Sequence, residues 1–64
     1  MKFIYLSRKY EDSTEAVIIN LDKVLWFEAT RGGTKIIMKI SDNTIDEITV
    51  IEDIVAINNR LNTI

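Results

Sequence analysis

The pattern of apolar and polar positions along the chain predicts five short strands followed by one helix. Short apolar and β-branched segments separated by turn-forming clusters are typical of strands. The predicted strands span residues 2–8, 15–20, 23–29, 34–40 and 44–48. The connections between them are short, whereas parallel neighbours would need a crossover of about a dozen residues. We therefore expect antiparallel neighbours in a twisted sheet.

The last two predicted strands differ in how regularly they alternate. Residues 34–40, TKIIMKI, place Ile36, Met38 and Ile40 on one face and Lys35, Ile37 and Lys39 on the other. In residues 44–48 the alternation slips, because Ile45 and Ile48 fall on opposite faces. A bulge near Asp46 and Glu47 would repair the register, and we predict one there.

The final segment changes to a helical period from Thr49 onward. Thr49 and Glu52 have the spacing of a capping box, in which two side chains satisfy free backbone N–H groups at a helix start. The apolar residues that follow recur three or four positions apart and would share one side of the helix: Ile51, Ile54, Ile57, Leu61 and Ile64. The predicted fold class is α+β, a five-stranded antiparallel sheet or small partial barrel followed by one C-terminal helix. Residues 1–64 would form a single domain.

Two turns have recognisable chemistry. Asn20 and Asp22 favour a tight bend between the second and third predicted strands. Residues 30–35, TRGGTK, separate the third and fourth, and glycines permit the backbone of a hairpin turn. A phosphate-binding loop of the Walker type would need separated glycines and a following helix, whereas a predicted strand follows here. The hairpin is therefore favoured, and the alternative is a loop that contacts an anion.

Three segments are apolar on both faces, and one helix can cover only one side of a sheet. These segments are Phe3–Leu6, Ala16–Ile19 and Val24–Phe27. Continuous apolar runs mark strands that are covered on both sides. Closing the sheet into a barrel would cover only its interior. We therefore predict a homo-oligomer, most simply a twofold dimer, with the interface residues Phe3, Tyr5, Ile18, Trp26, Phe27 and Ile37.

Composition narrows the range of functions. The 64 residues contain no cysteine and no histidine, and 47% are hydrophobic. The chain therefore lacks disulfides, thiol chemistry, the usual general base and the usual transition-metal ligand. We expect no enzyme activity and no cofactor. Acidic residues gather in the second half without a known ion-binding spacing, so a solvated surface is favoured over a metal site. We see neither a signal peptide nor a membrane-spanning run, and expect a soluble cytoplasmic protein that binds no membrane.

A basic row offers an alternative function. Lys35 and Lys39 share one face of a predicted strand, and Arg31 lies in the adjoining turn. Such a row could contact an anion, or single-stranded nucleic acid if Trp26, Tyr5 and Phe3 supplied stacking. The formal net charge is only −2, which does not by itself predict a nucleic-acid partner. Aromatic residues in short strands are more often core than stacking platforms.

The order of motifs resembles a known family. Ile19–Val24, Glu28, Thr34–Met38 and Thr49–Glu52, followed by a terminal helix, resemble the FlbD-type family of short motility-associated proteins over nearly the whole chain. The turn Asp42–Asn43 departs from the Asn-Gly type that this family favours, and the fifth strand carries extra residues. The resemblance implies a regulatory or binding role without a catalytic residue set.

A second resemblance covers less of the chain. Leu21–Ala29 and the hairpin after it are similar to the first half of a LytTR DNA-binding domain. The basic DNA-contacting segment of that family has no counterpart here. The sequence therefore predicts a small protein-binding protein, either a regulatory adaptor or a phage-encoded inhibitor, that acts as a homo-oligomer. The alternative is a nucleic-acid or nucleotide-binding protein that uses Arg31, Lys35 and Lys39.

Overall fold

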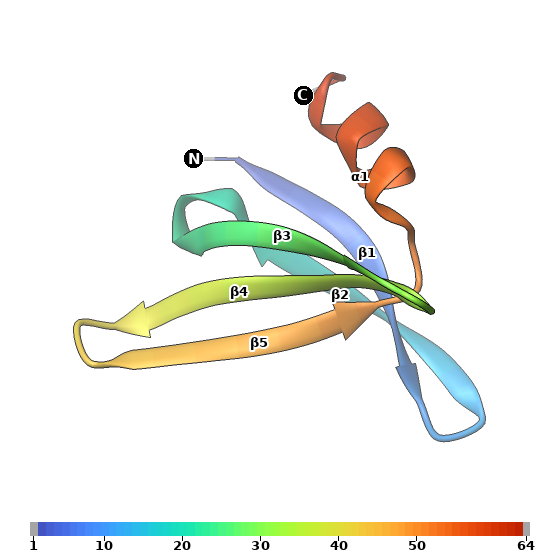
Figure 1. Cartoon of the computed structure of the whole chain (residues 1–64), viewed down its shortest axis with the longest axis horizontal. Helices are drawn as coiled ribbons and strands as arrows, with labels where there is room; N and C mark the ends of the chain where they lie inside the picture. The colour runs from blue at the N-terminus through green and yellow to red at the C-terminus, as the bar shows by residue number, and fades with distance from the viewer. Residues whose placement is uncertain (1, 64) are drawn as a thin grey trace.

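The computed structural model describes residues 2–63 and contains mostly strands with one C-terminal helix (Figure 1). This confirms the expected order of elements and the antiparallel pairing. The elements are β1 (Phe3–Tyr10), β2 (Ser13–Asn20), the short 3-10 helix η1 (Leu21–Lys23), β3 (Val24–Thr30), β4 (Gly33–Ser41), β5 (Thr44–Val50) and α1 (Ile54–Leu61).

The strands form two sheets, so the expectation of one five-stranded sheet was wrong. β1 and β2 make a hairpin, and β3, β4 and β5 make a separate antiparallel sheet in that order. Figure 1 shows the hairpin crossing the three-stranded sheet. The chain turns between them through η1, where the Asn20 side chain accepts a hydrogen bond from the Asp22 N–H at 3.0 Å. This capped turn is the predicted bend, and it directs β3 away from β2.

The core lies where the two sheets and the helix meet. The buried cluster takes residues from β1, β2, β4, β5 and α1: Ile4, Leu6, Ile19, Ile36, Val50 and Ile57. Phe27 and Met38 pack against this cluster from the three-stranded sheet. Ile36 and Met38 face the core as the alternation of β4 predicted, whereas Ile40 is exposed near the end of the strand. Ile37 is buried on the opposite face and does not belong to the cluster.

The fifth strand has no bulge at the predicted position. Glu47 lies opposite Ile37 and Asp46 opposite Met38 in regular register. The irregularity in this pairing instead falls near Ser41, beside the turn between β4 and β5. Ile48 consequently packs against the core, while Ile45 remains 63% exposed on the other face. The strand needs no bulge because an exposed isoleucine near a turn is tolerated.

The helix begins later than predicted, and the capping box does not form. Thr49 belongs to β5, where it lies opposite Lys35. Pairing with β4 therefore continues through Val50, and the chain leaves the sheet before it becomes helical. Asp53 is the N-cap, and its carboxylate accepts a hydrogen bond from the Ala56 N–H at 2.8 Å. Glu52 turns toward β1 instead.

The TRGGTK segment forms the predicted hairpin. Arg31 and Gly32 make the turn, and Thr30 lies opposite Gly33. Gly33 has a φ of 155° and lies against the end of β5, so that a β-carbon at this position would overlap the Val50 carbonyl oxygen. No heavy atom lies within 4 Å of a β-carbon built on Gly32. The two adjacent glycines therefore have different roles, and only Gly33 permits a close approach between strands.

Candidate interaction surface

The connection between β5 and α1 covers the outer edge of β1. The Ser7 N–H donates to Glu52 Oε1 at 2.9 Å, and the Ser7 carbonyl accepts from the Ile51 N–H at 2.8 Å. From the helix, Arg60 donates to the Tyr5 carbonyl and lies 3.4 Å from Glu52 Oε2. These contacts fix the hairpin against the rest of the domain. They also use backbone groups of β1 that another strand could otherwise pair with.

The pKa of the Glu52 carboxyl group in this contact is shifted. Burial of its carboxyl group raises the pKa, but the hydrogen bond from the Ser7 N–H and the positive charge of Arg60 outweigh that effect. The net pKa is lowered from the ordinary value of 4.5. The carboxylate is therefore the form that holds β1 to the C-terminal segment at neutral pH.

The outer face of the hairpin carries three exposed apolar side chains. Ile4, Leu6 and Ile19 point into the core, so alternate residues point outward. Tyr5 lies opposite Ile18 in the pairing of β1 with β2, and Phe3 lies two residues before Tyr5 on the same face. Phe3 is 44% exposed, Tyr5 65% and Ile18 59%. We call Phe3, Tyr5 and Ile18 the hairpin patch.

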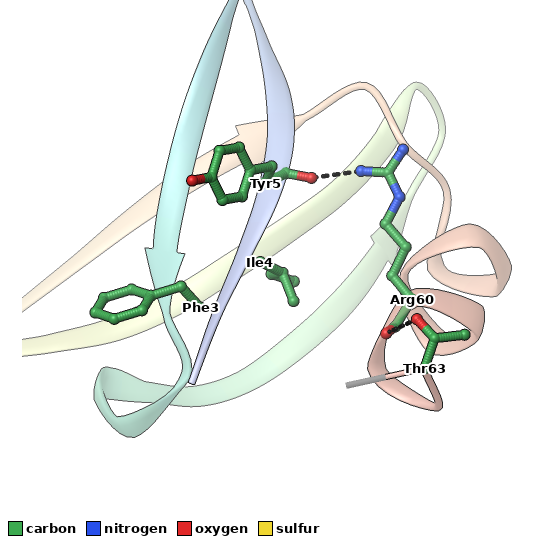
Figure 2. A pocket seen from close by; sticks show the side chains of 5 residues that line it. All are labelled: Phe3, Ile4, Tyr5, Arg60 and Thr63. Carbon is green, nitrogen blue, oxygen red and sulfur yellow. Dashed lines mark hydrogen bonds between the residues drawn. The ribbon is translucent and has the colours of Figure 1, made fainter. Parts of the chain in front are cut away.

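A hollow of about 430 Å³ lies beside this patch, between β1 and the end of α1. It is lined by Phe3, Ile4, Tyr5, Arg60 and Thr63. Figure 2 shows Arg60 reaching from the helix to the Tyr5 carbonyl, while the rings of Phe3 and Tyr5 project to the same side of β1, away from the helix. Phe3 and Tyr5 are therefore carried on a stretch of β1 whose backbone is held by the Arg60 guanidinium group.

The other predicted interface residues lie on the three-stranded sheet. Trp26 is 49% exposed, lies opposite Ile37, and donates its indole N–H to Glu28 Oε1 at 2.8 Å. Ile37 itself is buried, and Phe27 packs against the core. The six predicted residues therefore do not form one surface. Phe3, Tyr5 and Ile18 are brought together, Trp26 is exposed elsewhere, and Phe27 and Ile37 present little surface. Their role in an interface stays a prediction.

The predicted basic row is interrupted by acidic side chains. Arg31 lies in the exposed turn, and Lys35 and Lys39 share the outer face of β4. Lys35 lies opposite Glu28 on β3, and its ammonium nitrogen is 3.9 Å from Glu47 Oε2 on β5. Charges of both signs alternate across the strands, so this face has no continuous positive field.

Arg60 and Glu52 at the edge of β1 were not identified from the sequence. Arg60 is 55 positions from the carbonyl that it contacts, and Glu52 is 45 positions from Ser7. Local spacing had assigned Glu52 to a capping box. Only the packing of α1 beside β1 could have shown their shared role.

Between residues 2 and 63, no three acidic side chains gather in an arrangement that could hold a metal ion. Over the same range, no helix is long and apolar enough to cross a membrane. No family model, curated protein or solved structure matches the chain. The two family resemblances consequently stay predictions.

Proposed function

We propose that the protein is a small protein-binding module that associates with itself through the hairpin patch and acts as a regulatory adaptor or inhibitor. The observation that carries this proposal is the joint exposure of Phe3, Tyr5 and Ile18 on a strand pair whose other face already forms the core. Large apolar side chains scattered singly over a surface are ordinary, whereas a cluster on adjacent strands is typical of contact sites.

The exposed area of the hairpin patch is large enough to contribute measurably to the free energy of binding. Burying a large apolar side chain completely contributes about 1.5–3 kcal/mol. Covering the exposed halves of three such side chains would contribute on the order of 3 kcal/mol. The patch also needs little ordering on binding, because Glu52 and Arg60 already hold the backbone of β1 in place. A preorganised surface retains more of its contact energy as affinity.

The charge pattern favours a protein partner over nucleic acid. Glu28 and Glu47 lie among the lysines of the three-stranded sheet. Nucleic-acid binding draws most of its affinity from phosphate contacts by uninterrupted basic surfaces. The hairpin patch contains no charged side chain, which is typical of the centre of a protein interface.

The proposal is tested by measuring the mass of the protein in solution by light scattering after gel filtration, across micromolar concentrations. We expect a dimer for the natural sequence. The double variant Tyr5→Glu, Ile18→Glu should raise the dissociation constant at least about 100-fold, because two charges replace apolar contacts at the interface. Ile45→Glu is the matched control, since Ile45 has a similar exposure on β5, away from the patch.

Circular dichroism should show that all variants retain their strands. A monomeric natural protein throughout this range would overturn self-association. A dimer that is equally stable in the double variant and in the control would show that the patch is not the contact.

A further inference from the structure

The outer edge of β2 carries backbone groups that point away from the domain. Opposite residues in an antiparallel pair alternate between hydrogen-bonded and non-hydrogen-bonded positions. The N–H and carbonyl of Ser7 point away from β2, and so does the carbonyl of Tyr5, because their partners lie in the C-terminal segment. Ala16 lies opposite Ser7 and Ile18 opposite Tyr5. The backbone groups of Ala16 and Ile18 therefore point outward from the other side of the hairpin.

The other three edges are protected in ways that β2 is not. The edge of β1 is covered by the C-terminal segment. β3 has an irregular register at Leu25, and β5 carries Asp46 and Glu47 in its middle. Bulges and charges of this kind oppose edge-to-edge pairing. β2 pairs with β1 in unbroken register over its whole length, has no proline or lysine, and carries Glu15 as its one charged residue.

We propose that β2 of one copy pairs antiparallel with β2 of a second copy, and that this edge pairing is part of the self-association through the hairpin patch proposed above, on which the inference rests. A twofold axis at Val17 satisfies the outward backbone groups of both copies. It places Ala16 of one copy opposite Ile18 of the other, and Thr14 opposite Asn20. Apolar residues on the outer face thus meet apolar residues, and polar residues meet polar ones.

The charges of β2 are compatible with this pairing. Glu15 is paired with Arg8 of its own hairpin. In the Val17-centred register, Glu15 lies opposite Ile19 of the second copy, so the two Glu15 carboxylates do not oppose each other. A twofold axis at Ala16 would instead place Thr14 opposite Ile18 and mix polar with apolar positions on the outer face as well. Pairing at Val17 also brings the two hairpin patches together at the contact between the copies, because Ile18 of each copy lies opposite Ala16 of the other.

Hydrogen exchange of the natural protein tests the pairing directly. The amides of Ala16 and Ile18 should exchange at least about tenfold more slowly when the protein concentration is raised from well below to well above the dissociation constant. The amides of Val17 and Ile19 bond to β1 within the monomer and serve as internal controls, with a much smaller dependence on concentration.

A substitution at one position provides the second test. Ala16→Pro removes the outward N–H without removing a hydrogen bond to β1, and edge strands tolerate proline in this orientation. Ala16→Thr keeps the N–H and suits a strand, so it is the matched control. We expect the proline variant to be monomeric and the threonine variant to be dimeric.

The outcomes separate the two proposals. Slowed exchange at Ala16 and Ile18 with the expected masses supports edge pairing. A dimer whose Ala16 and Ile18 amides show no dependence on concentration overturns edge pairing while leaving self-association through the hairpin patch intact. A monomer at every concentration overturns both. The exchange measurement uses the natural sequence, so a proline variant that fails to fold does not affect that conclusion.

Discussion

Replacing each of the two adjacent glycines by alanine should have opposite consequences. At Gly33, an added β-carbon would overlap the carbonyl oxygen of Val50 and lie 3.0 Å from its carbonyl carbon. Both obstacles are backbone atoms, so no side-chain rotation relieves the overlap. Thr34 lies opposite Val50 in the pairing of β4 with β5, and moving the strands apart would disturb that pairing.

The expected loss for Gly33→Ala follows from two terms. Overpacking a tight site costs roughly 1–3 kcal/mol. A backbone conformation that favours glycine costs about 1–3 kcal/mol in any other residue. We expect a total loss of about 2–6 kcal/mol, against a folding stability of about 3–10 kcal/mol for a domain of this length. The melting temperature should fall by more than about 10 °C.

Gly32→Ala is the matched control at the neighbouring position. An added β-carbon meets no atom within 4 Å there, and the φ of Gly32 lies outside the range that alanine avoids. The substitution should change stability by between zero and about 1 kcal/mol in the stabilising direction, because alanine restricts the unfolded chain.

Urea unfolding, followed by Trp26 fluorescence and far-ultraviolet circular dichroism, measures both variants. Protein concentration must be held constant, because self-association would add to the apparent stability. If Gly33→Ala unfolds within about 0.5 kcal/mol of the natural protein, the close approach of β5 to Gly33 is not a constraint on the fold, and the argument fails.

Two further predictions concern charge. The pKa of Glu52 is lowered in the folded protein, so its carboxylate contributes stability that is present above about pH 4.5 and is lost as the pH falls through the folded-state value. Glu52→Gln should therefore cost about 1 kcal/mol at pH 7, and its urea midpoint should approach that of the natural protein as the pH falls below the folded-state pKa of Glu52. A constant difference across this range would contradict the role of the charge, and Glu47→Gln on an exposed side chain is the control. On the three-stranded sheet, the mixed charges predict no retention of the protein on heparin or DNA at low salt. Retention that the triple variant Arg31→Ala, Lys35→Ala, Lys39→Ala abolishes would instead favour nucleic-acid binding.

Local sequence was sufficient for the features that depend on near neighbours. The alternation in residues 34–40 and the Asn20 turn predicted elements that the structure contains. The hairpin at TRGGTK was predicted as well, since the backbone freedom of glycine is a property of the residue itself. The start of the helix could not be predicted from local sequence, because Thr49 has a capping-box spacing but also pairs with Lys35 in the sheet. Whether Thr49 caps the helix or pairs in the sheet is decided by its contact with β4, a strand that is distant in sequence.

The division into two sheets, and the surface that results from it, also could not be predicted from local sequence. Continuous apolar strands indicated that more surface exists than one helix can cover, but not which residues remain outside. Trp26 and Phe27 are adjacent aromatic residues, yet only Phe27 packs against the core. The sequence by itself determined the strands, their turns and the excess of apolar residues, because these depend on period and residue type. The tertiary structure alone decided which edge of the hairpin is covered and which is free, because the contacts from Glu52 and Arg60 join segments about 50 residues apart.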